Sequence, residues 1–249
     1  MAVPQSVLIT GANRGIGLGL VHAYLKLSGV KHVFGTARDP AAATEFASIK
    51  DPRFHALKMD VLCDESVKKA AEETTKILGS DGLNLLINNS GIFEKYDVLE
   101  TPDRKTLNKV IEVNATSQLI VTQFFLPLLR KAAASTSVWG IQRAAVIMMS
   151  SGAASIVDNT SGSKFIPAVA YRMSKAALNQ LMKTLAVDFE PHGILVASIA
   201  PGHVATDMGG KNADITVDES CSAMLDTFSK WKKEHSGGFF RRNGDPFPF

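Results

Sequence analysis

The 249-residue sequence predicts an α/β fold, a doubly wound parallel sheet of about seven strands with helices on both faces. The first observation is that short apolar runs alternate with longer amphipathic stretches along the chain. The second is that the short runs are apolar at successive positions, as in strands that are buried on both faces of a sheet. The third is composition: hydrophobic residues make up 45% and charged residues 20%, so a large core can form.

Each predicted strand is a short apolar run bounded by polar or glycine residues. The strands are predicted at 6–10, 32–37, 54–60, 83–88, 144–150 and 194–200, with a short one at 237–241. Helical periodicity predicts helices near 15–28, 40–49, 64–79, 103–134, 167–190 and 218–235. No repeat or low-complexity linker divides the chain, so residues 1–249 are expected to form a single domain.

The helix predicted at 103–134 is apolar over much of its length and could be mistaken for a membrane segment. It carries the polar residues Asn114, Gln118 and Gln123, and Pro127 interrupts it. We therefore expect a buried core helix with a kink at the proline, followed by a loop at 135–143.

Composition and residue spacing exclude several functional classes. The net charge is only +3 and the basic residues are scattered, so neither a nucleic acid nor a membrane is expected as a partner. The six histidines and the two cysteines, Cys63 and Cys221, show no metal-ligand spacing, so no metal site is expected. Neither a signal peptide nor an apolar run of about 20 residues is visible, and the expected location is the cytoplasm.

A glycine-rich stretch, TGANRGIG at 10–17, joins the first predicted strand to the first predicted helix. Such a turn lets backbone approach a ligand closely, and the new helix presents unpaired N–H groups to a pyrophosphate. A glycine trio alone would indicate only a tight turn, but its place between a buried strand and a helix favours nucleotide binding of the Rossmann type. The residues expected to contact the nucleotide here are Gly11, Asn13, Arg14, Gly15, Ile16 and Gly17.

The end of the second predicted strand bears on the choice of cofactor. An acidic residue here would bind the ribose 2′-hydroxyl of NAD, whereas an arginine would bind the 2′-phosphate of NADP. Ala37 is neutral, Arg38 follows it, and Arg14 adds a second guanidinium on the same side. NADP, as NADPH, is therefore the expected cofactor. Asp39 is the residue that could instead face the ribose and favour NAD.

Polar or glycine residues also follow the other predicted strands. They are Asp60, the NNSG stretch at 88–91, the SSG stretch at 150–152 and the PGHVATD stretch at 201–207. In an open parallel sheet, ligands bind outside the carboxyl ends of the strands. These segments, although scattered in sequence, are therefore expected to meet at one edge of the sheet.

Tyr171 and Lys175 stand four residues apart in a predicted helix, and therefore on one face of it. An aromatic ring packed beside a lysine stem would explain this spacing without any chemistry. The pair, however, follows a strand that ends in Ser150 and Ser151, near the predicted nucleotide edge. There an ammonium would lower the pKa of the phenol from about 10 and make it an acid–base group near neutral pH.

In combination, these motifs resemble the short-chain dehydrogenase/reductase family over essentially the whole chain. The matching positions are TGxxxGxG at 10–17, Asp60, NNSG at 88–91, Asn114, the serine after the fifth strand, Tyr171-x-x-x-Lys175 and PG…T at 201–206. Ser90 stands where the family commonly has alanine. The stretches YRMSKAALN, PGHVATDMGG and GGFFRRNGDPFPF are most similar to carbonyl reductases of the sniffer and C-factor type.

The resemblance implies that hydride passes between NADPH and a carbonyl or alcohol. Tyr171 would protonate the carbonyl oxygen, Lys175 would lower the pKa of Tyr171 and hold the nicotinamide ribose, and Ser151 would hydrogen-bond the substrate oxygen. Asn114 would complete a proton relay to solvent. The resemblance also implies cofactor contacts from Asp60, Val61, Asn88, Gly91, Tyr171, Lys175, Pro201, Gly202, Val204 and Thr206.

Two features near the predicted site stay open. Ser151 precedes Tyr171 by 20 residues, across a polar insertion at 152–167, whereas the family usually has about a dozen; Ser150 and Ser155 are therefore alternatives. The segment 203–217 is expected to be a substrate lid, in which His203 is either a substrate contact or a solvated loop residue.

The sequence therefore predicts a single dinucleotide-binding and catalytic domain, an NADPH-dependent carbonyl reductase for a small carbonyl substrate. The alternatives are an NADP-binding regulator or sensor without turnover, and an epimerase or dehydratase of the same family. The helices at 103–134 and 167–190 could form the interface of a homo-oligomer, dimer or tetramer, and the PFPF ending could pack on a neighbouring copy. Both segments could equally cover their own core.

Overall fold

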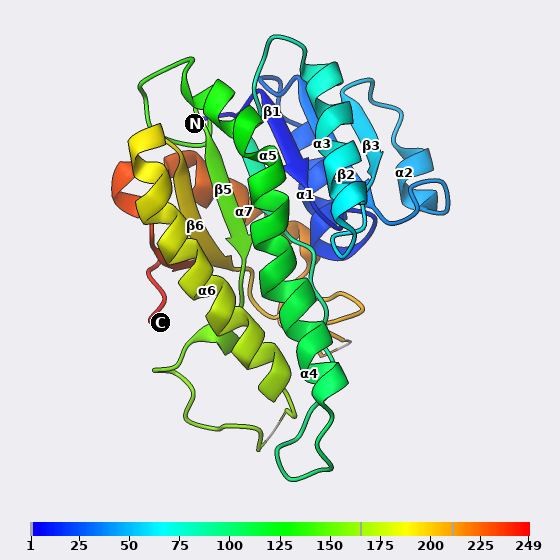
Figure 1. The fold of residues 1–249 in the computed structure, drawn as a ribbon, viewed down its shortest axis with the longest axis vertical. Helices are drawn as coiled ribbons and strands as arrows, with labels where there is room; N and C mark the ends of the chain where they lie inside the picture. Colours follow the sequence, from blue (N-terminus) through cyan, green and yellow to red (C-terminus); the bar gives the residue numbers. More distant parts are fainter. Residues whose placement is uncertain (1, 165, 211) are drawn as a thin grey trace.

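The computed structural model describes residues 2–164, 166–210 and 212–249, and it shows one sheet of seven parallel strands (Figure 1). The strands are β1 (Ser6–Ile9), β2 (His32–Ala37), β3 (Phe54–Lys58), β4 (Leu85–Asn88), β5 (Ala145–Met149), β6 (Leu195–Ala200) and β7 (Phe239–Arg241). They lie in the order β3-β2-β1-β4-β5-β6-β7, and every neighbouring pair is parallel. The predicted doubly wound sheet is confirmed, and the strand order reverses between β1 and β4.

Helices cover both faces of this sheet. They are α1 (Gly15–Leu25), α2 (Thr44–Ser48), α3 (Asp64–Leu78), α4 (Arg104–Ile111), α5 (Ser117–Ala133), α6 (Val169–Phe189) and α7 (Val217–Lys230). Single turns of 3₁₀ helix occur at Gly152–Ala154, Glu190–His192 and Lys233–His235. In Figure 1, α3, α5 and α6 lie in front of the sheet and α7 lies behind it.

Successive strand residues pack into two different hydrophobic cores. In β1, Leu8 packs with residues of α3, α5 and α6, whereas Val7 and Ile9 pack with residues of α1 and α7. Full burial of a side chain of this size contributes about 1.5–3 kcal/mol. A polar residue on either face of a central strand would lose that contribution, so most positions of β1, β4, β5 and β6 are apolar.

Two of the predicted helices lose about five residues each in the structure. The helix predicted at 40–49 is reduced to α2, because Asp39 Oδ1 accepts hydrogen bonds from Ala41 N and Ala42 N and holds those residues in a turn. The helix predicted at 218–235 ends at Lys230, because Trp231 has an extended backbone.

The region 103–134 is a helix interrupted at a place that the sequence did not predict. A π-helical turn, Glu112–Thr116, separates α4 from α5, and α5 runs through Pro127 without a break. At this turn the carbonyl of Val113 accepts a hydrogen bond from Gln118 Nε2 at 2.7 Å instead of closing a regular α-helical turn. Within the described ranges, no helix combines the length and the apolar character that crossing a bilayer would demand.

Two histidines on neighbouring strands are paired near the amino end of β2. His32 Nδ1 and His55 Nε2 lie 3.0 Å apart, and the ring of His55 also stacks on Phe34. One nitrogen must carry the hydrogen and the other must accept it, so the contact requires at least one neutral ring. Burial is the main cause that lowers the pKa of both histidines. The charge of Asp81 opposes this shift at His32, and the charge of Lys31 adds to it. At His55, the charge of His32 adds to the shift.

Because of this pair, we expect the free energy of unfolding to decrease as the pH decreases. The folded state resists protonation of both rings, while the unfolded chain takes up protons below about 6.5, so unfolding is favoured as the pH drops through that value. The variant His55→Gln removes one of the two groups, so its melting temperature should depend less on pH than that of the parent. Thermal unfolding across this pH range measures the difference. Parallel curves for the two proteins would show that the pair does not titrate in this way.

Candidate active site

The turn after β1 has a backbone that only glycine adopts easily. Gly11 and Gly15 have φ angles of +61° and +55°, in the left-handed region that other side chains disfavour. A Cβ on Gly17 would lie 2.5 Å from the carbonyl oxygen of Gly11, so no larger residue fits there. The first turn of α1 contains no acidic residue, and its N–H groups therefore remain suited to an anion.

Asn89, which the sequence analysis did not single out, ties this turn to the end of β4. Its side-chain amide donates to the carbonyl oxygens of Thr10 at 2.8 Å and Gly11 at 3.1 Å. In return, Thr10 Oγ1 accepts from the backbone N–H groups of Asn89 and Ser90. The NNSG stretch thus fixes the shape of the glycine turn, and its adjacency to the predicted Asn88 was the signal available in the sequence.

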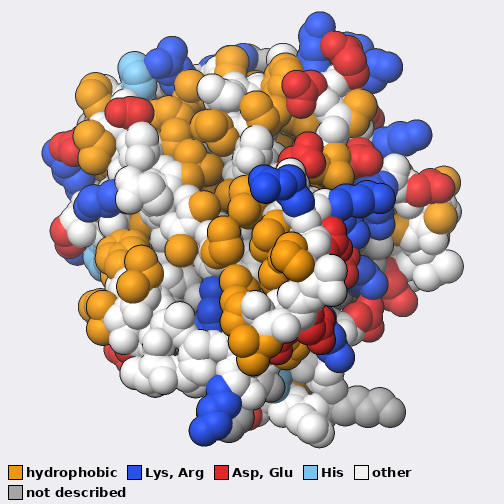
Figure 2. All heavy atoms as spheres, turned by 60° about the horizontal axis from the view of Figure 1, so that its bottom comes forward, with side chains coloured by type: hydrophobic (Ala, Val, Ile, Leu, Met, Phe, Trp, Pro, Cys, Tyr) orange, Lys and Arg blue, Asp and Glu red, His pale blue; other side chains and the backbone are white. Residues whose placement is uncertain are grey.

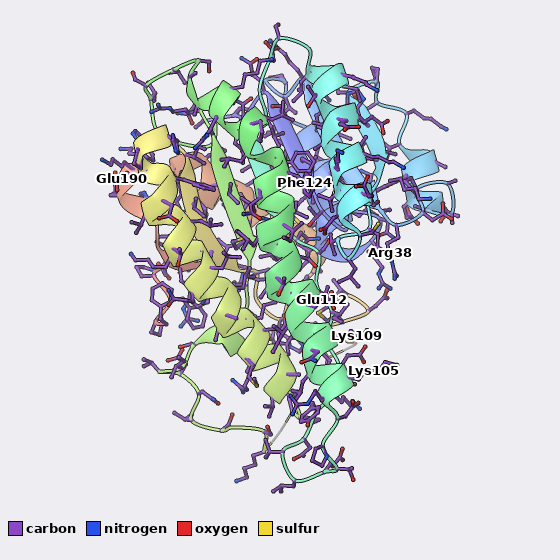
Figure 3. All side chains as sticks on the ribbon, in the orientation of Figure 1. Arg38, Lys105, Lys109, Glu112, Phe124 and Glu190 are labelled. Atoms are coloured by element: carbon purple, nitrogen blue, oxygen red, sulfur yellow. The ribbon has the colours of Figure 1, made fainter. Side chains whose placement is uncertain are left out.

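Three residues bear on the choice of cofactor and have different surroundings: Arg38, Asp39 and Arg14. Arg38 is exposed and lies below the end of β2 on the right of the molecule (Figure 3). Asp39 uses Oδ1 to accept from two backbone N–H groups of the following turn. Arg14 pairs with Asp207 at 2.8 Å, and both side chains are largely exposed. Asp39, the residue that could favour NAD, is therefore engaged locally.

The turn after β3 is shaped by Asp60. Its Oδ1 accepts from Leu62 N at 3.0 Å, and its own N–H donates to Ser66 Oγ at 3.0 Å. Val61, the other predicted residue of this turn, is half-buried.

Asn88 points into the protein. Its amide donates to Thr122 Oγ1 at 2.9 Å, which links β4 to α5. An exposed fraction of 1% leaves almost none of this side chain for a direct contact with a cofactor. The resemblance implied a cofactor contact for Asn88, whereas the observed arrangement matches a structural role, the attachment of β4 to α5.

Tyr171, Lys175 and Ser151 meet just beyond the end of β5. Tyr171 and Lys175 lie one turn apart on α6, and Lys175 Nζ is 5.6 Å from the centre of the tyrosine ring. Lys175 Nζ also donates to the carbonyl oxygen of Met149 at 2.7 Å. The phenol of Tyr171 is hydrogen-bonded to the side chain of Ser151, and Phe93 packs edge-on against its ring at 5.5 Å.

The pKa values of these groups follow mainly from burial. Burial raises the pKa of Tyr171, and the hydrogen bond with Ser151 acts in the opposite direction. Burial lowers the pKa of Lys175 to about 8. The pKa of the phenol is therefore above its ordinary value, because removal from water disfavours the phenolate. The sequence had predicted a shift in the opposite direction.

The three candidate serines are in unlike positions. Ser151 is half-buried, bonds to Tyr171 and accepts from Ala153 N at 3.1 Å. Ser150 is buried, and its Oγ has no partner among the described residues. Ser155 is buried and accepts from Asp158 N. Among the described contacts of the three serines, the hydrogen bond to the phenol is made by Ser151.

Asn114 lies in the π-helical turn and is fully buried. Its Oδ1 accepts from Ile92 N at 2.8 Å, while its Nδ2 donates to Ile92 O at 2.9 Å and to Ser174 Oγ at 3.0 Å. A Cβ on Gly91 would lie 3.3 Å from Asn114 Oδ1 and 3.5 Å from Lys175 Nζ. Gly91, which has no Cβ, therefore leaves open the space that a larger residue would occupy beside the amide and the ammonium.

The segment after β6 folds over the glycine turn. A Cβ on Gly15 would lie 3.4 Å from Thr206 Cγ2, and Val204 is buried and bridged to Ile215. Gly202 has a φ of +92°. The carbonyl of Pro201 accepts from Ser220 Oγ at 2.8 Å, which ties the start of the segment to α7.

His203 braces this segment from within. Its Nε2 lies 2.8 Å from the carbonyl oxygen of Gly209, and its Nδ1 lies 3.5 Å from Asp214 Oδ2. Both ring nitrogens thus face the loop itself and the side chain is 49% exposed, which fits a solvated loop residue that also braces the loop. Residue 211 of the predicted lid at 203–217 lies outside the described residues.

Histidine, cysteine, aspartate and glutamate side chains do not gather in groups of three or more suited to a metal ion anywhere in the described part of the chain. At the site, the groups able to move a proton are those of Tyr171, Lys175 and Ser151, and the groups suited to an anion are the amides of the glycine turn and the exposed guanidinium of Arg38.

Two solved structures carry the same architecture over essentially the full length of this chain. The chain is 38% identical in sequence to NADPH-bound carbonyl reductase from chicken fatty liver. Its crystal structure superposes on 100% of both chains with a TM-score of 0.95. It is 36% identical to carbonyl reductase Sniffer of D. melanogaster, with 99% of this chain and 100% of the other covered and a TM-score of 0.94. It is also 35% identical to C-signal of Myxococcus xanthus over 67% of this chain and 93% of that protein.

The family model described as short chain dehydrogenase matches residues 5–216, a range that contains the glycine turn, the end of β5 and the Tyr171–Lys175 pair. The chain belongs to the short-chain dehydrogenase family.

Proposed function

We propose that this chain is an NADPH-dependent carbonyl reductase in which residues 1–249 act as one dinucleotide-binding and catalytic domain. The observation that carries the proposal is the meeting of Tyr171, Lys175 and Ser151 at the same sheet edge as the glycine turn. The similarity to an NADPH-bound carbonyl reductase and to a second carbonyl reductase supports the same reaction.

The residues present fit a dinucleotide. The glycine turn has no side chain at Gly11, Gly15 or Gly17 to obstruct a ligand, and the N-terminus of α1 suits a pyrophosphate. When bound, NADPH supplies the hydride. Arg38 would bind the 2′-phosphate, Asp60 and Val61 would lie near the adenine, and Thr206 would close over the nicotinamide end.

Tyr171 would act as the acid of the reaction. The carbonyl carbon of the substrate gains a hydride, and the phenol gives its proton to the carbonyl oxygen, so the product is an alcohol. Ser151 would hydrogen-bond the same oxygen and stabilise the charge that develops there. Lys175 would stabilise the phenolate that remains, and Asn114 would hold water for the return of a proton.

The surroundings of the site favour apolar carbonyl compounds. The loops at 93–102 and 155–168 lie side by side, because Tyr96 N donates to Pro167 O at 2.8 Å and Val169 N donates to Tyr96 O. These loops and the segment after β6 carry exposed apolar side chains at Val98, Leu99, Ile156, Val157, Ile166 and Met208. Figure 2 brings this edge forward and shows hydrophobic side chains gathered across it. We call these six residues the apolar rim.

A regulator that binds NADP without turnover is the second candidate. The similarity to C-signal favours it. A sensor, however, has no use for a serine bonded to a phenol beside a buried lysine, and that arrangement favours the enzyme.

Two unpaired cysteines, one exposed and one buried, support a reducing compartment such as the cytoplasm. A homo-oligomer built on α5 and α6 stays a prediction.

The first test is the variant Tyr171→Phe. We expect kcat/KM for NADPH-dependent reduction of a panel of apolar ketones and aldehydes to fall by roughly 10²–10⁴-fold, because the acid is lost. The fall in NADPH absorbance measures turnover, and fluorescence titration checks that NADPH still binds. Tyr24→Phe is the matched control, since the buried hydroxyl of Tyr24 has no partner among the described residues. A parent that binds NADPH but reduces nothing would favour the sensor.

The second test concerns the choice of cofactor. Arg38→Ala should weaken NADPH binding by roughly tenfold to hundredfold, the loss expected for a hydrogen bond between charged groups, and should leave NADH binding nearly unchanged. Titration of both dinucleotides measures the two affinities. Arg130→Ala, which removes an exposed arginine of α5, is the control. Equal losses for both dinucleotides would contradict the proposed role of Arg38.

The third test separates the serines. Ser151→Ala should lower kcat/KM by roughly 10²-fold or more, and the alkaline limb of its pH profile should move to higher pH, because the hydrogen bond that lowers the pKa of Tyr171 is lost. Ser150→Ala should retain activity, since its hydroxyl bonds to no described residue. The opposite ranking of these two variants would assign the role to Ser150.

A further inference from the structure

The segment at 245–249 folds back onto its own chain. Phe247 N donates to the carbonyl oxygen of Phe239 at 2.8 Å, and the two rings stack with centroids 4.8 Å apart. The guanidinium of Arg241 lies 3.9 Å from the centre of the Phe247 ring. The PFPF stretch, which the sequence left between a neighbouring copy and its own core, thus packs on its own strand β7.

The ring of Phe247 also reaches the residue after Ser151. A Cβ on Gly152 would lie 3.1 Å from Phe247 Cζ, so ring and backbone are in close contact. Phe247 packs in a small hydrophobic cluster with Ala154, Ala200 and Phe239. This cluster is separate from the two large cores, and it joins the single helical turn at Gly152–Ala154 to the ends of β6 and β7.

Two further contacts extend this support along the chain. The carbonyl of Phe249 accepts from Val157 N at 3.1 Å. Arg241 lies 3.9 Å from Asp158. The side chains at 156–160 are exposed. The segment that follows Ser151 is therefore held from its inner side by residues 239–249.

The position of Ser151 depends on this turn. Ser151 Oγ accepts from Ala153 N at 3.1 Å, so the hydroxyl and the turn are fixed to each other. The same hydroxyl bonds to Tyr171. A shift of Gly152–Ala154 into the space of a missing ring would therefore change the position of the hydroxyl relative to the phenol.

We propose that Phe247 is a positioning residue of the active site, which holds the Gly152–Ala154 turn so that the Ser151 hydroxyl meets the Tyr171 phenol. The inference rests on the proposed function for its effect on turnover, while its effect on Tyr171 does not require turnover. Phe247 itself does not touch the phenol in any described contact, and it acts through Gly152.

The test is Phe247→Ala in the full chain. We expect kcat/KM for NADPH-dependent ketone reduction to fall by about tenfold, a part of the loss expected for removal of the serine itself, while the affinity for NADPH stays within about twofold. The alkaline limb of the pH profile should move in the same direction as in Ser151→Ala. Phe247→Tyr keeps the ring and should restore both values. Phe247→Leu retains much of the volume and serves if the alanine variant fails to fold.

A control separates positioning from general stability. Phe189→Leu changes a buried residue at the other end of α6, and its loss of melting temperature can be compared with that of Phe247→Ala. If both lose stability and only the Phe247 variant shifts its pH profile, the inference holds. If Phe247→Ala keeps the profile and kcat/KM of the parent, or loses activity only in step with stability, it is overturned.

A second measurement works without turnover. Ultraviolet titration of the parent and of Phe247→Ala, each compared with the same protein carrying Tyr171→Phe, gives the pKa of Tyr171 directly. A higher pKa in the Phe247→Ala background supports the inference, and an unchanged pKa overturns it. A parent that reduces no carbonyl would defeat the proposed function alone, and this titration would still decide the role of Phe247.

Discussion

The hydrogen bond from Lys175 Nζ to the carbonyl of Met149 is the contact on which the candidate site depends. It fastens α6 to the end of β5 at the point where the strand gives way to Ser150 and Ser151. The bond measures 2.7 Å, and Tyr171 lies one helical turn from Lys175 on α6. The same bond therefore also holds Tyr171 near Ser151. Burial takes this ammonium out of water and lowers the pKa of Lys175 to about 8.

The parallel sheet places these groups together because every strand delivers its carboxyl end to one edge. The glycine turn after β1, the NNSG stretch after β4, the serines after β5 and the PGHVATD stretch after β6 come from segments nearly 200 residues apart in sequence. The alternation of side chains between two cores fixes the register of each strand, and with it the direction of each loop. A slip of one residue in β5 would move Ser151 to the other face.

The sequence predicted the sheet, the glycine turn and the Tyr171–Lys175 pair, because each depends on short-range spacing along the chain. It did not predict the π-helical turn at Glu112–Thr116, the bonds of Asn89, the contact of Phe93 with Tyr171 or the brace formed by His203. Those features depend on which distant segments meet, and no local pattern records it. The interruption of this helix likewise lies at Glu112–Thr116, near the buried polar contacts of Asn114, whereas α5 continues through Pro127, where the sequence had placed the interruption.

The apolar rim belongs to neither large core. Leu99 is 91% exposed and Ile156 is 77% exposed, so both contribute little to the stability of the scaffold. Selection can therefore vary the rim at almost no cost to folding, while Tyr171 and Lys175 remain constrained by their burial. Descendants of such a protein could acquire new substrate specificities through substitutions in the apolar rim alone, while the reaction itself stays the same.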